Sequence, residues 1–378
     1  MSKKQNIQWI IATIIMVVLT AVLYIRYDIE HKKAIETDVP SSSVTGENRK
    51  KQVLPSSEVE KTSEESTSEY EADTASTVSE SSEEMVESAD MTESKVALDS
   101  KLKAEDIYNL DLMKEDGIEL LKLDQYKNTA NVIDRTLAEF NVNSSEISLA
   151  YYDFQNDEHY YINGDTFLTA ASIAKVHLAA LYIDELQQGE ITLSTELAYS
   201  DKLFEEGAGK VTNQPSKATY TVDELLTEAI IHSDNTAMNI LKKAYEDEHG
   251  NYRESVLDFV GLDADKEIYQ EYLNSNVGSA HLIEQVLIKI ATDDTYQDLI
   301  DLMTQTTPTQ LFTRYVTGDR MANKFGRFDK SVNDCGIYYE NGQPQYALIV
   351  LTDNVEDADH FLEVMNLRVN QWFRHKYL

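Results

Sequence analysis

The sequence is short of cysteine and of basic residues, and each shortage limits what the protein can be. Its 378 residues include one cysteine, Cys335, so no disulfide can form within the chain. Lysine and arginine number 33 against 67 aspartates and glutamates, which gives a net charge of −34. Nucleic acid is therefore not expected as a partner, because phosphate binding requires clustered lysine and arginine. An anionic membrane surface is disfavoured for the same reason.

Metal-binding patterns and internal repeats are also missing. No His-x-x-x-His pattern and no histidine/cysteine cluster appears, so we predict neither a metal site nor a cofactor. His177, His232 and His281 lie close in sequence to the motifs described below, but no pattern gives them a role. Cys335 lies in an apolar stretch, which favours a buried thiol over a catalytic one.

From Ile7 to Ile25 the chain has no charged residue, and most side chains there are apolar. Because about 20 apolar helical residues span the hydrocarbon core of a bilayer, we predict a cytoplasmic head at 1–6 and a transmembrane helix at 7–26. Trp9 and Tyr24 lie near its two ends, where such rings prefer the interface. A short head and a long following domain favour a single-pass protein with its C-terminal domain outside the cell. A cleaved secretory signal is the alternative, but no small-x-small cleavage motif follows the stretch.

Residues 27–101 have the composition of a disordered tether. The run from Ser56 to Ser100 is mostly serine, threonine, glutamate and aspartate, with Tyr70 as its single aromatic residue. Such a segment cannot bury enough apolar surface to offset the entropy lost on ordering. As a random coil, about 70 residues reach roughly 50 Å. An acidic segment that folds on a partner is the alternative. An exported domain on a long tether suits the cell membrane of a Gram-positive bacterium.

Residues 102–378 are predicted to form a domain of the α+β class. Asn156-Asp157 and Asn341-Gly342 are turn signals between apolar runs, and Thr221 with Glu224 forms a capping box that opens a helix. We expect, in order, a helix at 128–140, a β-hairpin at 146–154 and 159–162, helices from 172–188 and from 221, strands at 320–328, 334–340 and 346–352, and a helix at 356–372. Strands at both ends of a helical region indicate one antiparallel sheet and a separate helical part.

The helix that begins at Ser172 is apolar on nearly every side, yet it contains Lys175 in its first turn. Residues three apart share a helix face, so the amine and the Ser172 hydroxyl should meet. Burial lowers the pKa of a lysine, and a neutral amine can then activate a serine nucleophile. Ser-x-x-Lys also arises by chance, as Ser100 and Lys103 show, so the pattern alone does not establish catalysis.

Two further elements accompany it. Ser233-Asp234-Asn235 follows the helix that opens at Thr221; its residue types suit a helix cap, but Ser233 can also relay a proton and Asn235 can bind a substrate amide. Lys324 and Gly326 lie on a predicted strand, where the lysine can fix a carboxylate and the glycine lets a ligand approach the backbone.

The three elements occur in the order found in penicillin-recognising serine enzymes. From about residue 125 to 378 the chain resembles class A β-lactamases and small penicillin-binding proteins, also in the segments 167–172, 220–226 and 333–337. The resemblance implies a β-lactamase-like fold, with an antiparallel sheet flanked by helices and an all-helical subdomain. It also implies membership of the wider family of β-lactamase-like transpeptidases.

The same resemblance implies roles for the motif residues. Ser172 attacks an amide or lactam carbonyl, and Lys175, helped by Ser233, takes its proton and later returns it to the leaving nitrogen. The backbone N–H groups of Ser172 and Arg327 form the oxyanion hole. Asn235 holds the acylamide side chain of the substrate. Lys324 directs positive charge toward the substrate carboxylate.

Two positions depart from the family pattern. Class A β-lactamases have a Glu-x-x-Leu-Asn motif whose glutamate activates the deacylating water, and here Gln270 stands in its place. An amide cannot act as a general base, so slow deacylation is predicted, unless a register shift brings in Glu271. Phe325 replaces the usual threonine or serine, which removes a hydroxyl for the substrate carboxylate and is expected to narrow the groove. Arg327 is a candidate to compensate.

Three hypotheses therefore remain from the sequence. The first is a serine hydrolase acylated at Ser172 by β-lactams or peptidoglycan stem peptides. The second is a tethered wall-binding or scaffold module that has kept the fold and lost turnover, as Gln270 and Phe325 suggest. The third is a glutaminase-like amidase, which shares Ser-x-x-Lys but is disfavoured by the export anchor.

Overall fold

The structure, a computed structural model, describes residues 98–317 and 320–378. The predicted cytoplasmic head, the transmembrane helix at 7–26 and nearly all of the tether at 27–101 lie outside these residues. Among the described residues, no helix is both long and apolar enough to cross a bilayer.

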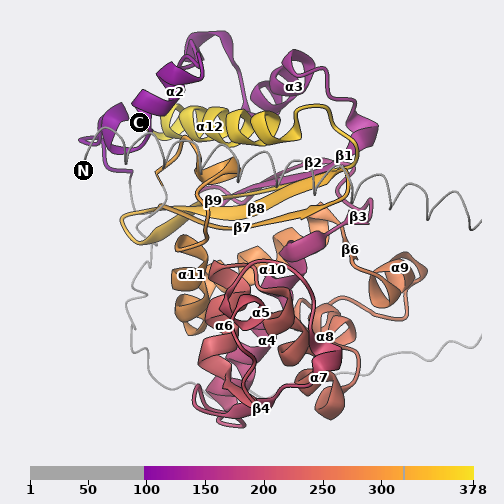
Figure 1. Ribbon diagram of the computed structural model, residues 1–378. Coiled ribbons are helices and arrows are strands. Elements are labelled where there is room, and N and C mark those ends of the chain that lie inside the picture. Colours follow the sequence, from indigo (N-terminus) through magenta and orange to yellow (C-terminus); the bar gives the residue numbers. More distant parts are fainter. Residues whose placement is uncertain (1–97, 318–319) are drawn as a thin grey trace, which may run out of the picture. The chain divides into compact units, whose positions relative to one another are not determined.

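One antiparallel sheet organises the described residues, with five strands in the order β2-β1-β9-β8-β7 (Figure 1). The strands are β1 Ile147–Asp153, β2 Glu158–Ile162, β7 Met321–Phe328, β8 Ser331–Glu340 and β9 Gln343–Thr352. Asp157 in the β1–β2 turn and Asn341-Gly342 in the β8–β9 turn have positive φ, as tight hairpin turns require. The sheet therefore joins an early hairpin to three late strands through the pairing of β1 with β9.

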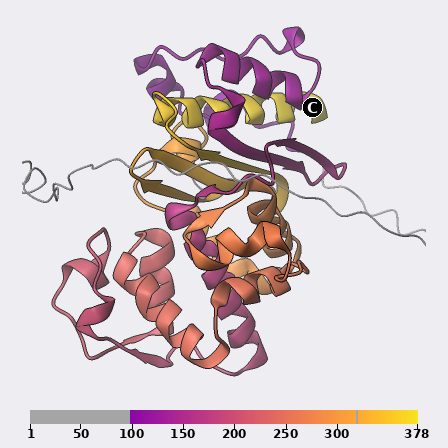
Figure 2. The same ribbon diagram turned by 90° about the vertical axis from the view of Figure 1, so that its right-hand side faces the viewer.

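Helices cover both faces of this sheet (Figures 1 and 2). On one face lie α2 Leu110–Glu115, α3 Thr129–Glu139 and the long C-terminal helix α12 Ala358–Tyr377. On the other lies a helical part with α4 Ala174–Gln188, α5 Lys210–Asn213, α6 Val222–Ile231, α7 Asn235–His249, α8 Tyr252–Phe259, α9 Gln270–Asn274, α10 Ala280–Thr292 and α11 Gln297–Thr304. Because both faces are covered, β1 is buried at every position and reads as a nearly continuous apolar run.

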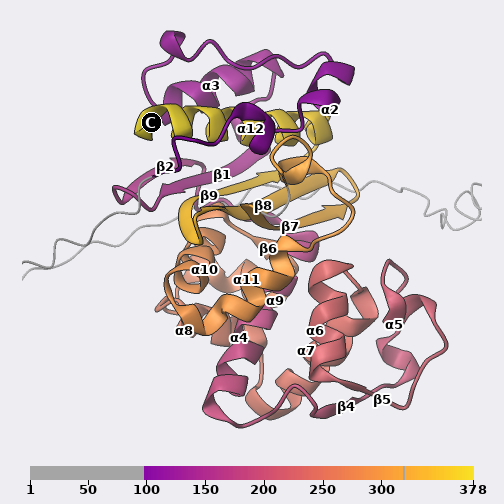
Figure 3. The ribbon, with the colours of Figure 1, turned by 90° about the vertical axis from the view of Figure 1, so that its left-hand side faces the viewer.

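The helix predicted to be buried, α4, lies inside the helical part (Figure 3). Most of its residues are buried on all sides, so the absence of a polar face in its sequence has a direct cause. It ends at Gly189 in the left-handed conformation, as predicted. The capping box at the start of α6 also forms, because the Thr221 and Glu224 side chains each accept a hydrogen bond from the other residue's backbone N–H.

Two small ribbons complete the described strands. β3 Leu168–Thr169 pairs with β6 Val277–Gly278, and β4 Glu196–Ala198 pairs with β5 Thr219–Thr221. The first ribbon leads directly into the segment that contains Ser172, so it connects the start of α4 to the chain that follows α9.

Candidate active site

Ser172 lies in a short 3-10 turn, Ala171–Ile173, that leads into α4. The preceding residue, Ala171, has φ of +49°, in the left-handed region that alanine rarely adopts. Such strain persists only where the surroundings hold the backbone in place. The turn therefore presents the serine in one imposed orientation.

Hydrogen bonds from distant segments hold this turn. The Ala170 N–H donates to the Asn276 carbonyl over 3.0 Å, and Asn276 Nδ2 donates to the Ala171 carbonyl over 3.3 Å. Asn333, on β8, donates from Nδ2 to the Thr169 carbonyl over 2.7 Å. The nucleophile segment is thus tied both to the chain after α9 and to the central sheet.

Lys175 is 4% exposed, and its amine lies among four oxygen atoms. Nζ is 3.0 Å from Ser172 Oγ, 2.7 Å from the Ser233 carbonyl oxygen, 3.3 Å from Ser233 Oγ and 2.7 Å from Asn235 Oδ1. Burial lowers the pKa of Lys175 to about 7, and the positive charge of Lys324 acts in the same direction. The amine is therefore neutral in a large fraction of molecules near neutral pH.

The geometry favours a lone pair directed at the serine. A carbonyl oxygen can only accept, so the Ser233 carbonyl takes one N–H of Lys175. The Asn235 side chain is oriented by Nδ2, which donates to the Glu206 carbonyl over 2.9 Å and leaves Oδ1 as acceptor for a second N–H. A neutral amine then has its lone pair left for the Ser172 hydroxyl proton.

Ser233 connects two lysines. Its φ is +59°, and its Oγ accepts from Lys324 Nζ over 3.0 Å in addition to lying 3.3 Å from Lys175 Nζ. Lys324 is fully buried, also donates to the Phe325 carbonyl over 3.1 Å, and has its pKa lowered to about 8 by burial. A continuous path for a proton therefore runs from Ser172 through Lys175 and Ser233 to Lys324.

Asp234, between the two motif residues Ser233 and Asn235, has a structural task. Its carboxylate caps α7 at the Ala237 N–H over 2.9 Å and accepts from Thr212 N and Oγ1 over 3.0 and 2.8 Å. Gly209 packs so closely that a Cβ there would lie 2.2 Å from Asp234 Oδ2. The helix cap predicted for this motif therefore forms at Asp234, and the same cap holds Ser233 and Asn235 in place on either side of it.

Gly326 brings the backbone of β7 against the nucleophile. A Cβ on Gly326 would lie 2.7 Å from Ser172 N and 2.9 Å from the Ala170 carbonyl oxygen, so only glycine permits the approach. Arg327 follows directly. The two amides predicted for the oxyanion hole therefore belong to two backbone segments that touch.

One expectation about this strand, that Phe325 narrows the groove, is wrong. The Phe325 side chain is 9% exposed and packs in the apolar cluster beside α12, so it does not narrow the groove. Successive side chains of a strand point to opposite faces, and Lys324 and Gly326 occupy the face toward Ser172. The guanidinium of Arg327 pairs with both carboxylate oxygens of Asp359 and donates to Gln310 Oε1 over 3.1 Å. This ion pair is exposed to solvent, where such pairs are weak, and Arg327 still lines the groove.

Ser172 and Lys175 open into a groove of about 260 Å³. Asn235 and Arg327, both predicted site residues, also line it. Its remaining walls were not predicted from the sequence: Ala171, Ala174, Glu205, Met238, Asn239, Lys242, Tyr252, Arg253, Asn276 and Phe328. The spacing of Met238, Asn239 and Lys242 after Asn235 is a helix-face pattern that could have indicated three of them.

Gln270 and Glu271 do not reach this groove. Both are exposed on α9, and Gln270 Nε2 donates to the Ala264 carbonyl over 3.4 Å. Asn274 of the same motif donates from Nδ2 to the Gln270 carbonyl over 2.7 Å. Neither register of the motif therefore supplies a carboxylate to the groove.

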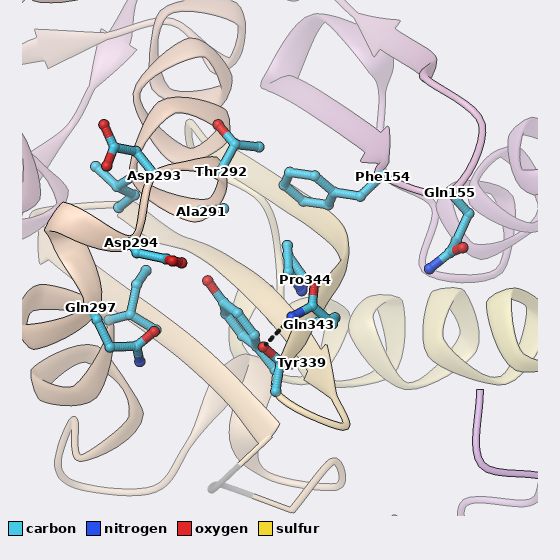
Figure 4. Close-up of a pocket in the computed structure, with 13 residues that line it drawn as sticks. Phe154, Gln155, Ala291, Thr292, Asp293, Asp294, Gln297, Tyr339, Gln343 and Pro344 are labelled. Carbon is cyan, nitrogen blue, oxygen red and sulfur yellow. Dashed lines mark hydrogen bonds between the residues drawn. The ribbon is translucent and has the colours of Figure 1, made fainter. Parts of the chain in front are cut away.

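A larger hollow, about 450 Å³, lies elsewhere (Figure 4). Phe154 borders it from the β1–β2 turn, Tyr339 and Pro344 from the β8–β9 hairpin, and Asp294 and Gln297 from the chain after α10. None of the predicted catalytic or substrate-binding residues lines it. Its size alone does not make it the reacting site.

Several titratable groups that sequence or geometry singles out do not line the groove. His177 is buried on α4, 3.3 Å from the Tyr272 hydroxyl, and burial lowers its pKa to about 3, so the ring is neutral. Glu185, Glu190 and His249 bring ligand atoms within 4.8 Å of one another near the far end of α4, and nothing else there indicates a metal. The Cys335 thiol is buried and its pKa is raised by that burial, as expected of an unreactive thiol.

Comparison with known proteins agrees with this arrangement. A family model described as the Beta-lactamase enzyme family matches residues 128–371. No curated protein sequence matches the chain.

Solved structures match in fold. A PBP-A mutant, in an acyl-enzyme complex with penicillin G, has a TM-score of 0.54 and 18% identity, covering 65% of this chain and 97% of that chain. A β-lactamase from Sphaerobacter thermophilus DSM 20745 has a TM-score of 0.52 and 18% identity, covering 64% and 94%. An ancestral class A β-lactamase (GNCA) has a TM-score of 0.54 and 21% identity, covering 63% and 99%. At this identity the likeness shows the fold, and it confirms the β-lactamase-like α+β prediction.

Proposed function

The chain belongs to the β-lactamase enzyme family and is a serine hydrolase of that type, and from this premise we propose that Ser172 is its nucleophile. The acyl donor is a β-lactam or a peptidoglycan stem peptide, and release of the acyl group is slow. The observation that carries the proposal is the 3.0 Å contact between Lys175 Nζ and Ser172 Oγ, at an amine whose pKa is lowered to about 7 by burial.

Acylation follows from the hydrogen bonds around these two residues. Ser172 Oγ attacks the carbonyl carbon while its proton passes to the lone pair of Lys175. Negative charge develops on the carbonyl oxygen, where the amides of Ser172 and Arg327 would receive it. The proton then passes through Ser233 Oγ to the leaving nitrogen, the C–N bond breaks, and an ester on Ser172 remains.

Release of this ester requires a water molecule and a base. The exposed amide of Gln270 cannot take a proton from water, and Glu271 does not line the groove. A positioned general base typically contributes about 10²–10⁴-fold to such a step. The acyl-enzyme should accordingly accumulate to nearly one acyl group per chain.

Intact-mass measurement on the full-length chain in detergent tests acylation. Incubation with benzylpenicillin should add one penicillin mass, and Ser172→Ala should abolish the addition. Ser100→Ala is the matched control, because Ser100 and Lys103 form the chance Ser-x-x-Lys match on an exposed segment. An unmodified wild-type chain, or an adduct that persists in Ser172→Ala, would contradict the assignment.

The same sample tests slow release. After removal of free penicillin, the adduct mass should persist far longer than a catalytic turnover. Rapid hydrolysis of a chromogenic cephalosporin would contradict this part of the proposal and leave Ser172 as nucleophile untouched.

Anchoring and location form a separate part of the proposal. The apolar run at 7–26 and the acidic segment at 27–101 support a single-pass membrane protein with the enzyme domain outside the cell. Protease added to intact cells of a Gram-positive host expressing the chain should remove the domain while the membrane stays sealed. Protection of the domain until the cells are lysed would contradict this topology.

A wall-binding module without turnover is the second candidate. Neither position 270 nor position 271 places a carboxylate in the groove. This favours a binding module, because such a module does not need to release an acyl group. It predicts that neither the wild type nor Ser172→Ala gains mass with any β-lactam, whereas both bind wall fragments equally.

A further inference from the structure

The Ser172 groove continues along one face of α7, beyond the reacting groups. Asn235, Met238, Asn239 and Lys242 line it. Their spacing of three, four and seven residues places them on one side of the helix. Lys242 lies about 10 Å along the axis from Asn235, at 1.5 Å per residue. Since Asn235 is the residue proposed to hold the acylamide group, this arm should receive the acyl side of the substrate.

The groove lining also contains an arginine that has no carboxylate partner among the residues that the structure describes. Arg253, the second residue of α8, is half-buried and lines the groove. Its guanidinium carbon lies 4.7 Å from the ring centre of Tyr252 and 5.9 Å from that of Tyr272, and both rings are buried. Within residues 98–317 and 320–378, no carboxylate lies within ion-pair distance of it. Carboxylates do pair with other guanidinium groups of the chain, those of Arg314, Arg327, Arg368 and Arg374.

Two other charged side chains, Lys242 and Glu205, line the groove beside α7. Lys242 Nζ lies 3.8 Å from Glu246, a loose contact on the helix surface. Glu205 is the single acidic residue among the groove-lining residues described, and its Oε2 accepts from Asn239 Nδ2 over 2.9 Å. A chain with a net charge of −34 thus has both Lys242 and Arg253 in the lining of one groove.

We propose that Arg253, assisted by Lys242, forms a subsite for a carboxylate on the acyl side of the substrate. A planar guanidinium binds a carboxylate through two parallel hydrogen bonds, and two buried tyrosine rings lie beside this one. The preferred donors are acyl groups whose side chain ends in a carboxylate, whether an acidic peptide or an acid-bearing β-lactam. The subsite rests on the proposed acylation of Ser172.

A matched pair of penicillins tests the subsite. One carries an adipoyl chain, which ends in a carboxylate, and the other carries a hexanoyl chain of the same length. The measured quantity is the ratio of their second-order acylation rate constants, followed by intact mass on the full-length chain. A charge-assisted hydrogen bond makes the adipoyl compound about 10- to 100-fold faster in the wild type. Arg253→Gln should bring the ratio close to one, and Arg253→Lys should keep part of it.

Arg135→Gln is the control variant. Arg135 also lies over a tyrosine ring, 5.0 Å from that of Tyr126, but it belongs to α3 on the other face of the sheet. Its substitution should leave the ratio as in the wild type. A wild-type ratio near one, or a ratio that Arg253→Gln does not change, would overturn the subsite.

A second arm identifies the source of the carboxylate and separates this inference from the proposed function. Stem-peptide analogues with glutamate or glutamine before the scissile residue replace the penicillins, and a preference for glutamate assigns the subsite to acidic peptides. If no donor acylates Ser172, the proposed function fails. The subsite is then judged by calorimetric binding of the adipoyl and hexanoyl compounds to Ser172→Ala, with and without Arg253→Gln. Equal binding of the two compounds would overturn it.

Discussion

Replacing Lys324 by methionine should move the pH dependence of acylation upward. Lys324 Nζ and Lys175 Nζ lie 3.0 and 3.3 Å from the same atom, Ser233 Oγ, so they are separated by at most the sum of these distances. At about 6 Å and an effective dielectric constant of about 20, two positive charges repel by about 3 kcal/mol, which corresponds to about 2 pKa units. The pKa of Lys324 is itself lowered to about 8, so this lysine is mostly charged at neutral pH.

The sign follows from the form of Lys175 that reacts. The neutral amine accepts the Ser172 proton, so the acylation rate should rise with pH through about 7 and level off above it. Lys324→Met removes a positive charge that favours the neutral amine, so the pKa of Lys175 rises. The rising limb should then move to between about pH 8 and 9. The buried methionine preserves most of the volume, although the loss of the bond to Ser233 lowers the plateau.

The assay is the second-order rate constant for acylation by benzylpenicillin between pH 5 and 10, followed by intact mass. Lys330→Met is the control, because Lys330 is exposed in the β7–β8 turn and its charge should not change the pH range over which the acylation rate rises. If the acylation rate rose over the same pH range in the wild type and in Lys324→Met, the electrostatic coupling of the two lysines would be refuted.

Three further predictions concern stability, release and backbone approach. Lys175→Met should raise the melting temperature by the equivalent of a few kcal/mol at pH 7 and by less at pH 10. The folded state lowers the pKa of the Lys175 amine from 10.5 to about 7, so the wild type regains stability as the pH rises between these two values. Equal gains at both pH values would contradict this. Gln270→Glu should not shorten the lifetime of the penicillin adduct in a mass time course, because residue 270 is exposed and outside the groove. Gly326→Ala should slow acylation at least about 100-fold, since its Cβ would lie 2.7 Å from Ser172 N; a rate near that of the wild type, with a normal melting temperature, would exclude the close approach.

The arrangement of the motif side chains could be predicted because each position requires a particular residue type. A lysine in the first turn of an apolar helix has few structural explanations, and Ser172 with Lys175 indicated the contact directly. Ser233, Asn235 and Lys324 followed from motif order. In the structure, hydrogen bonds of the two lysine amines join these five side chains into one network.

The misplaced strand residue shows what sequence reasoning overlooked. Lys324 and Gly326 must face Ser172, and the two-residue period of a strand then directs Phe325 to the opposite face. The residue was interpreted by its place in a motif rather than by this period. The last helix was also predicted too short, because Arg374 and Lys376 interrupt the apolar pattern. In the structure they pair with acidic groups of the sheet strands, so α12 continues to Tyr377.

Arg253 illustrates what could not be predicted. Nothing in its local sequence distinguishes it from a solvent-exposed arginine in the first turn of a helix. Its position depends on how α8 packs beside α7 and on where the chain around α9 runs, and both are set by tertiary contacts. Its lack of an acidic partner within residues 98–317 and 320–378 depends on how these segments pack together.

The pairing of β1 with β9 determines when the enzyme can become active during its synthesis. Ile147 pairs with Thr352, so about two hundred residues must emerge before the early hairpin finds its neighbour. Lys324 and Gly326 arrive on β7 only shortly before that. A nascent or prematurely terminated chain can therefore contain the Ser172 helix and the Ser233 loop and still have no complete groove. Contacts between such distant segments also slow folding. A complete groove thus requires strands from the last sixty residues of the chain as well as the early hairpin.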